Sequence, residues 1–553
     1  MNYNIAIRLT NYAKEEPNAV AIIEPVPKRN AADERKYRTI TFSELDRDSD
    51  LICAALLRSG VKSGTKIALM VPQGIDFISL VFGVLKSGAT LVLIDPGMGI
   101  KQMLQCLDEV NLDGFAAISK VHAVRCVLQR LGRFPNAKFN LTVGRRWFWG
   151  GLSLPRIRKE QIADTTFIPR KPDDPAAIIF TSGSTGVAKG VLFTHGIFQT
   201  QVEEIQGRLE IQPGSVDLAG FPFFGLFNAA MGVTAVIPDM DSTHPANVDP
   251  RNILEAARDW KINQSFGSPA LWNRVVEHCE HNPKESEPLA TLRRVVSAGA
   301  PVSVKLLDRL KRILHPDAEI YTPYGATEAL PVAMISATEV LDETAPKTAT
   351  GGGICVGSRF GSIRWKVIGI TDTPIENLEQ AKECGVGEIG ELAVSGPQVT
   401  TKYVTRTEAN AFAKMRDADG KTWHRMGDVG YLDEKDRFWF CGRKAHRVET
   451  EHGTLFSIPC ESIFNQHPKV FRSALAGAAI KDSASPWREP VMFIELKPGE
   501  QPSDELEREL KTLAEQNPLT QRIERILFCP AFPVDVRHNA KINREKLSEL
   551  AGT

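Results

Sequence analysis

The chain lacks an excess of charge, a long apolar run and a leader-like N-terminus, and each absence excludes a class of protein. Its 67 Lys and Arg residues balance 67 Asp and Glu residues. A strongly basic nucleic-acid binder or an acidic disordered chain is therefore not expected. Because no run of 18 or more apolar residues occurs, no membrane-spanning helix is expected. The N-terminal segment carries charges every few residues and has no apolar core, unlike a secretory signal.

Paired cysteines are also missing. Nine cysteines are scattered along the chain, and no two of them form a C-x-x-C pair. An odd, scattered set predicts neither a disulfide framework nor a structural zinc site. We expect buried free thiols in a reducing compartment, and hence a cytoplasmic protein.

What is present is an ordinary globular composition at considerable length. Hydrophobic residues make up 42% and charged residues 24% of 553 positions, close to the usage of folded domains. A chain of this size can bury a large core without covalent cross-links. At about 150 residues per domain, the length predicts three or four domains.

Alternating helical and strand patterns predict an α/β fold. Apolar runs at 66–71 and 90–95 are typical of strands, and residues 77–89 between them are typical of a helix. This order predicts a mostly parallel sheet with helices on its faces, and it resumes from 178 to about 335. A preceding helix is predicted over 45–61, with an apolar face made of Leu51, Ile52, Ala55 and Leu56.

The pattern changes towards the C-terminus. Residues 161–176 are rich in proline and charge and predict a linker. Short antiparallel strands with glycine turns are predicted at 386–396 and 437–443. The last hundred or so residues predict a small α+β unit, with strands at 473–480 and 490–497 and a helix at 504–516.

A glycine-rich loop after an apolar strand carries the strongest chemical signal. Glycines let several backbone N–H groups approach an anion, and hydroxyls add further donors. Lys189 supplies a positive charge, which suits terminal phosphates. Ala188 precedes this lysine where a Walker A loop needs glycine, so another phosphate-binding class is indicated. The loop consists of Thr181, Ser182, Gly183, Ser184, Thr185 and Gly186, followed by Lys189 and Gly190.

The stretch TSGSTGVAKG resembles the phosphate loop of the adenylate-forming superfamily, which includes acyl-CoA ligases, luciferases and peptide-synthetase adenylation domains. The resemblance implies that this loop binds ATP, with Thr185 and Lys189 also serving catalysis. A second stretch, SAGAPVS at 297–303, resembles the adenine-wall segment of the superfamily. Backbone groups facing the base would come from Gly299, Ala300 and Pro301.

The stretch YTPYGATEALPV at 321–332 resembles the next superfamily motif. By that resemblance, Tyr324 stacks on adenine, Thr327 bonds the α-phosphate and Glu328 holds Mg²⁺. A carboxylate suits a hard cation, which in turn shields phosphate charge. Gly325 and Ala326 belong to the same nucleotide-binding motif.

Two further motifs complete the resemblance. Asp428, in HRMGDVG, resembles the carboxylate that takes both ribose hydroxyls, and Arg443, in CGRK, resembles an arginine that reaches ribose or phosphate. Lys541, in FPVDVRHNAKINREKL, aligns with the catalytic lysine that bridges carboxylate and phosphate oxygens, although Ala540 replaces the usual glycine. A fixed cation there would stabilise charge that develops as the carboxylate attacks the α-phosphate.

The resemblance spans about residues 10 to 550. It implies a large N-terminal adenylate-forming domain, 1–442, built from layered α/β subdomains and a small distorted β-barrel. A hinge at 443–447 would lead to a small mobile α+β C-terminal domain, 448–553. The implied half-reaction converts a carboxylate and MgATP into acyl-AMP and pyrophosphate.

Several positions depart from ordinary acyl-CoA ligases. Ala445 replaces the usual hinge acid or lysine, and Thr450 replaces a glycine of the loop that normally lines the pantetheine tunnel. Gly225 stands where a histidine is often found. With these variants, the motifs resemble the OleC family, the β-lactone synthetases of bacterial long-chain olefin biosynthesis. That resemblance implies adenylation of a long-chain 2-alkyl-3-hydroxy fatty acid and attack by its own 3-hydroxyl, without CoA. It also implies possible assembly with other olefin-pathway enzymes.

Alternatives remain open at this point. A long-chain fatty acyl-CoA ligase or a fatty acyl-AMP ligase would share the first half-reaction. A non-catalytic binding module would be expected to lose Lys541 or Glu328, and both are present. His195 and His446 are candidates for accepting the hydroxyl proton by residue type alone, and a structural role is favoured for each. For GRRWFWGGLSL, 144–154, a packed strand with buried aromatics is favoured over a membrane or partner patch.

Overall fold

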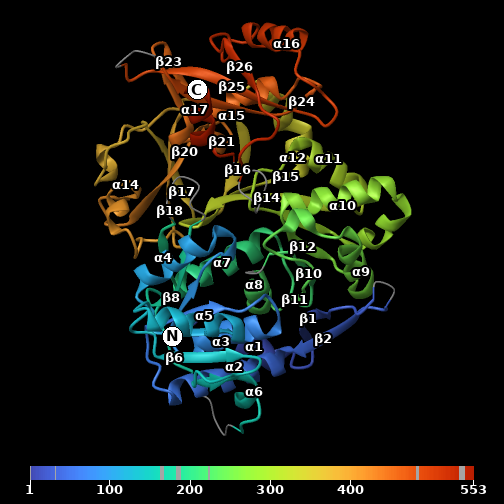
Figure 1. The fold of residues 1–553 in the computed structure, drawn as a ribbon, viewed down its shortest axis with the longest axis vertical. Coiled ribbons are helices and arrows are strands. Elements are labelled where there is room, and N and C mark those ends of the chain that lie inside the picture. The colour runs from blue at the N-terminus through green and yellow to red at the C-terminus, as the bar shows by residue number, and fades with distance from the viewer. Residues whose placement is uncertain are drawn as a thin grey trace.

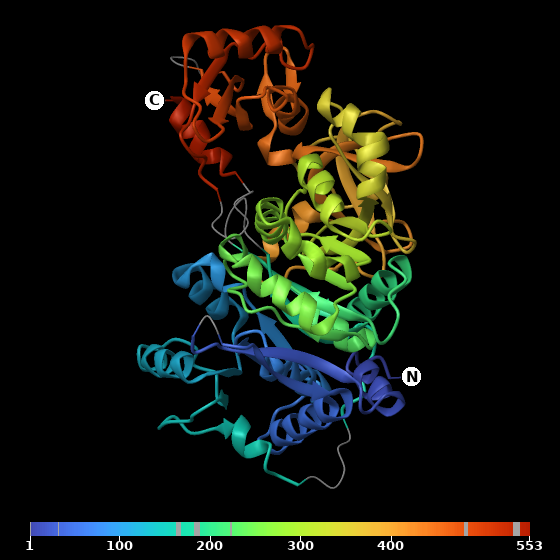
Figure 2. The same cartoon turned by 90° about the vertical axis from the view of Figure 1, so that its right-hand side faces the viewer.

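The computed structural model describes residues 2–30, 33–161, 167–181, 188–221, 224–480, 485–534 and 542–552. The C-terminal elements, orange to red, lie at one end of the long axis, and the first 150 residues lie at the other (Figures 1 and 2). Within the described ranges, no helix is long and apolar enough to cross a membrane. All nine cysteines are free, and most of them are buried.

The first sheet contains the parallel strands that the sequence predicts. Its order is β7-β6-β5-β3-β4-β8-β9, and only the β8–β9 pair is antiparallel. A parallel arrangement buries both faces, which is why the strand at 90–93 is entirely buried. The strands are β3 Lys66–Met70, β4 Thr90–Leu93, β5 Gly114–Ile118, β6 Phe139–Val143, β7 Leu152–Ser153, β8 Pro175–Phe180 and β9 Gly190–Thr194.

Helices cover this sheet as predicted. Helix α2 begins with a capping box in which Thr41 and Glu44 satisfy each other's backbone N–H groups. The four predicted core residues of α2 are all buried, which confirms its apolar face. The helices of this part are α1 Ile7–Glu15, α2 Phe42–Arg58, α3 Ile75–Lys86, α4 Ile100–Val110, α5 Ser119–Arg130, α6 Leu154–Ile157 and α7 His195–Arg208.

The predicted packed strand at 144–154 is wrong for most of its length. Only Leu152 and Ser153 are in a strand, and the side chains of Trp147 and Phe148 are 49% and 76% exposed. Trp149 is half-buried, and its indole N–H donates to Thr142 Oγ1 at 2.9 Å. Glycines with positive φ at 144, 150 and 151 favour turns over a continuous strand here.

The second sheet joins parallel and antiparallel halves. Strands β10 to β14 run parallel, and the β14–β15 hairpin then reverses the direction. The antiparallel strands from β15 onward are therefore joined to the parallel strands in one continuous sheet. The strands are β1 Val20–Val26, β2 Lys36–Thr41, β10 Val216–Ala219, β11 Thr234–Val236, β12 Gln264–Gly267, β13 Arg294–Ser297, β14 Glu319–Ala326, β15 Ala329–Ser336, β16 Ile354–Arg359, β17 Arg364–Ile368, β18 Gly390–Ser395, β19 Lys414–Arg416, β20 Thr422–Leu432 and β21 Arg437–Arg443.

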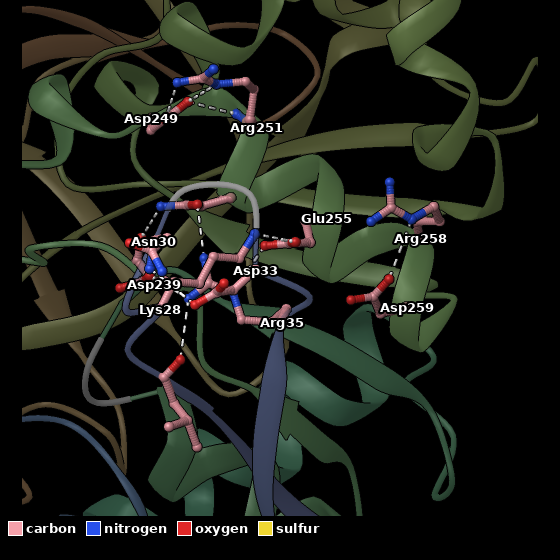
Figure 3. A network of polar contacts seen from close by, with 12 residues as sticks. Lys28, Asn30, Asp33, Arg35, Asp239, Asp249, Arg251, Glu255, Arg258 and Asp259 are labelled. Carbon is pink, nitrogen blue, oxygen red and sulfur yellow. Dashed lines mark hydrogen bonds and ion pairs between the residues drawn. The ribbon is translucent and has the colours of Figure 1, made fainter.

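A polar network ties the N-terminal hairpin of this sheet to a helix (Figure 3). Arg35, just before β2, donates to Glu255 at 2.9 Å and to Asp239 at 2.6 Å. Its side chain is 4% exposed, so these charged partners offset its desolvation. Lys28 adds an ion pair with Glu255 at 2.7 Å. The helices of this half are α8 Phe224–Met231, α9 Pro250–Trp260, α10 Pro269–His281, α11 Val304–Ile313, α12 Ala337–Glu339, α13 Ala345–Ala349 and α14 Asn410–Ala413.

Residues from 448 onward pack around hydrophobic clusters of their own. A buried ion pair between Arg544 and Glu461, at 2.7 Å, joins the last helix to the first helix of this part. Burial raises the pKa of Glu461, and Arg544 opposes that shift. The elements are β22 Val448–Thr450, β23 Gly453–Leu455, α15 Ser457–Phe464, β24 Val470–Ala479, β25 Arg488–Leu496, α16 Asp504–Glu515, β26 Arg525–Phe528 and α17 Arg544–Gly552.

The predicted hinge segment forms a short turn, Lys444–His446. Lys444 Nζ donates to the carbonyl of Thr371 at 3.0 Å and pairs with Glu391 at 3.1 Å. Arg447 pairs with Asp372 at 2.5 Å. The segment is therefore held against the loop that follows β17.

Candidate active site

The two ends of the predicted phosphate loop are joined by backbone geometry. Thr181 follows β8, and its N–H donates to the carbonyl of Lys189 at 3.0 Å. In return, the N–H of Lys189 donates to Thr181 Oγ1 at 3.1 Å. These two bonds extend the β8–β9 pairing and bring both ends of the loop to one place. Ser182, Gly183, Ser184, Thr185 and Gly186 lie outside the described residues.

The predicted adenine segment lies beside Tyr324. Gly299, Ala300 and Pro301 follow β13, which runs parallel to β14 with Val296 opposite Tyr321. Because the carboxyl ends of parallel neighbours share one edge, the segment meets the end of β14, where Tyr324 stands. Gly299 has φ +92°, a conformation that favours glycine.

Tyr324, Asp428 and Arg443 form a hydrogen-bonded group. The Tyr324 hydroxyl donates to Asp428 Oδ2 at 2.5 Å, and Arg443 Nη1 donates to Asp428 Oδ1 at 2.7 Å. Arg443 is opposite Asp428 in the β20–β21 register. The Asp428 charge raises the pKa of Arg443, and burial together with Asp428 raises the pKa of Tyr324. Both donors therefore hold the Asp428 side chain in a fixed orientation.

Glu328 is held by both its main chain and its side chain. The Tyr403 hydroxyl donates to Glu328 Oε1 at 2.6 Å. The Glu328 carbonyl accepts from the N–H and the hydroxyl of Thr400, each at 2.9 Å. Burial, and then the Glu328 charge, raise the pKa of Tyr403, so the phenol stays a donor. A bridge between Tyr403 and Val191 on β9 brings this phenol beside the predicted phosphate loop.

Two lysines flank the ring of Tyr403. Lys189 Nζ lies 4.8 Å from the ring centroid, and Lys414 Nζ lies 5.7 Å from it, both within cation–π range. Lys414 also donates to the carbonyl of Thr400 at 2.5 Å. Burial lowers the pKa of Lys414 to about 7, although Glu328 opposes the shift. Two lysine amino groups therefore lie beside the ring that orients Glu328, and burial makes that of Lys414 easier to deprotonate.

His424 lies opposite Lys414 in the β19–β20 register. Its Nδ1 lies 3.0 Å from the carbonyl of Ala413. Burial, followed by the charge of Lys414, lowers the pKa of His424 well below its ordinary value. A neutral imidazole therefore adds no further positive charge to the cluster.

Most of the predicted site residues that the structure describes lie in two adjoining groups. The first contains Tyr324, Asp428 and Arg443, and the second joins Lys189 to Glu328 through Tyr403. The Glu328 charge also contributes to raising the pKa of Arg443, which links the groups electrostatically. Gly325, Ala326 and Thr327 occupy the end of β14 and its turn. Lys541 lies outside the described residues.

Sequence reasoning missed four residues of this site. Thr400, Tyr403 and Lys414 lie between the motifs quoted above, and His424 begins HRMGDVG, in which only Asp428 was given a role. No spacing marks them, because their proximity to Glu328 depends on contacts across the sheet and the loops beside it. The sequence feature that could have drawn attention to this segment is the basic and aromatic pair Lys402-Tyr403, shortly after the predicted strand at 386–396.

The protein offers one carboxylate, that of Glu328, to a cation whose remaining ligands would be phosphate oxygens and water. Among the described residues, no group of three or more His, Cys, Asp and Glu side chains could hold a metal ion. Mg²⁺ commonly uses one or two carboxylates and completes its shell with phosphate oxygens and water. The single carboxylate of Glu328, oriented through its other oxygen by Tyr403, matches that pattern.

Burial lowers the pKa of both candidate histidines, and one of them is held by a hydrogen bond. His195 Nδ1 accepts from the N–H of Ile5 at 3.2 Å, and burial lowers its pKa to about 4. Burial lowers the pKa of His446 to about 3, with further contributions from Arg544 and Arg443. These surroundings favour the structural role expected for each residue.

Comparisons with known proteins agree with the motifs. Residues 9–404 match the family model described as AMP-binding enzyme. The chain is 41% identical to the olefin beta-lactone synthetase of Xanthomonas campestris pv. campestris, over 99% of this chain and 97% of that protein. It is also 41% identical to the olefin beta-lactone synthetase of Stenotrophomonas maltophilia, over 99% and 98% respectively.

Solved structures share the fold at low identity. The amide bond synthetase McbA from Marinactinospora thermotolerans matches with a TM-score of 0.80 and 19% identity over the whole of both chains. The anthranilate CoA ligase AuaEII, solved with anthranoyl-AMP, matches with a TM-score of 0.78 and 19% identity over all of this chain and 98% of the other. At such identities the likeness shows the fold alone.

Proposed function

We propose, since this chain belongs to the AMP-binding enzyme family, that it is an ATP-dependent β-lactone synthetase. Its substrate would be a long-chain 2-alkyl-3-hydroxy fatty acid, and its products a β-lactone, AMP and pyrophosphate. The observation that carries the proposal is the likeness to two olefin beta-lactone synthetases over nearly the full length of each. Adenylation itself is supported by the family and by the two adjoining residue groups around Asp428 and Glu328.

In the first half-reaction, the residues would bind and orient the nucleotide. Tyr324 and the Gly299 segment would enclose adenine, and Asp428 would accept from the ribose hydroxyls. Lys189, positioned by the Tyr403 ring, would contact the phosphates. Glu328 would hold Mg²⁺, which when bound shields the phosphate charge. Lys541 would then stabilise charge as a carboxylate oxygen bonds the α-phosphorus and pyrophosphate leaves.

In the second half-reaction, the 3-hydroxyl oxygen would bond the activated carbonyl carbon. The bond from that carbon to the AMP oxygen breaks, AMP leaves with the electron pair, and the hydroxyl proton passes to a base or water. The nucleophile belongs to the substrate already, so positioning replaces a second binding step.

Two local features support an acceptor other than a thiol. Gly225 of α8 stands where a histidine is often found in acyl-CoA ligases, and it packs against α3, with an added Cβ atom 2.9 Å from Ile78 Cδ1. Thr450 closes the β22–β23 hairpin by donating its hydroxyl to the carbonyl of Gly453 at 2.7 Å. A β-branched residue replaces the usual glycine where a pantetheine path would run.

The domain boundary belongs to the same proposal. Residues 1–442 would form the adenylate-forming domain, 443–447 the hinge and 448–553 a mobile lid. The separate hydrophobic clusters of the C-terminal residues support this division. Rotation of the lid would require Lys444 and Arg447 to change their contacts with 371–391.

The deciding experiment omits CoA. The protein is incubated with ATP, Mg²⁺ and a 2-alkyl-3-hydroxy acid, and the products are followed by NMR and by AMP release. We expect β-lactone, and we expect an analogue without the 3-hydroxyl to stop at acyl-AMP. Thioester formation upon CoA addition, without any lactone, would instead identify an acyl-CoA ligase.

A matched pair of lysine variants tests the adenylation step. Lys541→Ala is expected to lower acyl-AMP formation strongly, because the attacking carboxylate loses its cation. Lys546→Ala removes an exposed lysine from α17 and should leave the rate unchanged. Equal acyl-AMP formation by the two variants would refute the role of Lys541.

A further inference from the structure

One segment departs sharply from the balanced charge of the chain. Residues 114–159 contain no Asp or Glu, whereas the whole chain has as many acidic as basic residues. Positive charge in this segment is therefore not neutralised by its own sequence. The basic residues are Lys120, Arg125, Arg130, Arg133, Lys138, Arg145, Arg146, Arg156, Arg158 and Lys159.

Helix α5, labelled in Figure 1, carries exposed apolar side chains. Val124, Val127 and Leu131 are 58%, 58% and 74% exposed. Their spacing of three and four residues places them on one face, the pattern that normally faces a core. Lys120 extends the same stripe by one helical turn.

The inner face of α5 is polar, and its side chains form hydrogen bonds. His122 Nε2 lies 2.9 Å from the carbonyl of Leu141, and Arg125 Nε donates to His122 Nδ1 at 3.2 Å. Gln129 donates to the carbonyl of Ala137 at 2.9 Å. Turning the helix to bury its valines would leave these buried polar groups unpaired, at considerable cost. The polar contacts of the inner face therefore fix the orientation of α5, with its apolar stripe facing outward.

Exposed aromatic side chains lie beside α5, on the flank of the helix that carries Cys126 and Arg130. The Trp149 ring stacks on His122 with centroids 5.6 Å apart. Trp147 and Phe148 pack against Trp149, with centroids 5.3 and 5.4 Å away. Phe148 also lines a shallow hollow of about 490 Å³ together with Cys126 and Arg130 of α5. We call Val124, Val127, Leu131, Trp147 and Phe148 the α5 surface.

Cations border the α5 surface. Arg130 lies beside Phe148 in the hollow, and the backbone of Arg145 accepts from Ser119 at the start of α5. Lys120, Arg130 and Arg145 make no ion pair with another residue of the described ranges. Arg133 of the same segment pairs with Asp108 and so neutralises that carboxylate.

We propose that the α5 surface docks on an anionic lipid surface. Exposed valine, leucine and phenylalanine side chains would enter the acyl boundary, Trp147 suits the interface, and the bordering cations would meet lipid phosphates. A second copy of the chain would bring two like-charged surfaces together. A nucleic acid would satisfy the cations but offers no apolar phase for the Val124 stripe. Docking would be peripheral, and it does not depend on the proposed lactone chemistry.

Vesicle co-sedimentation tests the proposal with the full chain. We expect binding to phosphatidylglycerol/phosphatidylcholine vesicles, weak binding to pure phosphatidylcholine, and loss of binding as salt rises from about 0.05 to about 0.5 M. The double variant V127S/F148S should weaken binding by about tenfold, because it removes buried apolar area. The double variant K120Q/R130Q should also weaken it by about tenfold.

Matched variants control for general changes in surface character. V386S/F471S removes an exposed valine and an exposed phenylalanine elsewhere, and K284Q/K305Q removes two exposed lysines elsewhere. Both controls should bind vesicles like the unaltered chain. All four variants should release pyrophosphate at the unaltered rate with a dispersed substrate, which shows that each is folded.

Several results would overturn lipid docking. One is absence of binding to anionic vesicles, and another is equal binding by V127S/F148S and the unaltered chain. A concentration-dependent dimer in sedimentation velocity, abolished by V127S/F148S without vesicle binding, would assign the surface to a second copy. Binding to duplex DNA that exceeds vesicle binding and is abolished by K120Q/R130Q would assign it to nucleic acid.

Discussion

At the scale of single residues, Tyr403 connects the predicted motifs of the active site. Its hydroxyl orients Glu328, and its ring lies within cation–π distance of Lys189 and Lys414. This phenol, beside two lysine amino groups and a carboxylate, remains a hydrogen-bond donor, because burial raises its pKa. Tyr403 therefore acts as a positioning residue for the groups that would contact phosphate and Mg²⁺.

Removal of the Tyr403 hydroxyl should impair the use of MgATP. A hydrogen bond to a charged group contributes roughly 1.5–3 kcal/mol, so Tyr403→Phe should lower kcat/KM for pyrophosphate release by about tenfold or more. The half-saturating Mg²⁺ concentration for ATP binding should rise, which is measured by equilibrium dialysis. Tyr37→Phe is the matched control, since its hydroxyl donates to Asp259 at 2.9 Å away from this cluster. An unchanged Mg²⁺ dependence would contradict the role of Tyr403.

At the scale of elements, a glycine sets the distance between two helices. Gly83 lies in α3 where it crosses α2, and a Cβ atom added there would lie 2.5 Å from Ile52 Cγ2. Such a contact is far below van der Waals distance, and the carbonyl of Ser49 is also only 3.1 Å away. The crossing therefore depends on the missing side chain.

Gly83→Ala should destabilise the protein by about 1–3 kcal/mol, because the helices must separate or shift. Gly207→Ala is the matched control, since Gly207 lies in α7 with no atom within 4 Å of an added Cβ. There the change should stabilise by up to about 1 kcal/mol through helix propensity. Urea unfolding followed by tryptophan fluorescence measures both. Equal stability of the two variants would contradict the close-packing interpretation.

Elements with strong periodicity were predictable, and their ends were less so. The helix predicted at 77–89 is α3, Ile75–Lys86, and the strand predicted at 473–480 is β24, Val470–Ala479. Residues 144–154 were mispredicted because adjacent aromatics indicate burial in a strand. Their exposure follows from the inverted packing of α5, which a local pattern does not reveal.

At the scale of the whole molecule, the segment between the two proposed domains contains a pH-sensitive residue. His446 faces Arg443 on β21 and Arg544 on α17, and its pKa falls from 6.5 to about 3 through burial and these charges. Between those pH values the unfolded state binds more protons than the folded state. Stability is therefore fully present above pH 6.5 and is lost as the pH falls towards 3.

His446→Asn should reduce the acid sensitivity of the C-terminal part. The wild-type slope from His446 is at most about 1.4 kcal/mol per pH unit over this window, and the variant should lack it. Hydrogen-exchange mass spectrometry of residues near the hinge, compared at pH 7 and pH 5, measures the difference. His452→Asn, on the exposed β22–β23 hairpin, should behave like the unaltered chain. Identical acid sensitivity of all three proteins would count against His446.

The sequence by itself determined the superfamily motifs and the parallel α/β core. It also identified Tyr324, Glu328, Asp428 and Arg443 as candidate site residues. These are local properties, because periodicity and turn chemistry act over a few residues. Only the tertiary structure decided that Tyr403 and Lys414 meet Glu328, and that the apolar stripe of α5 faces outward. Such contacts join residues far apart in the chain, and their energies come from burial, which no local pattern contains.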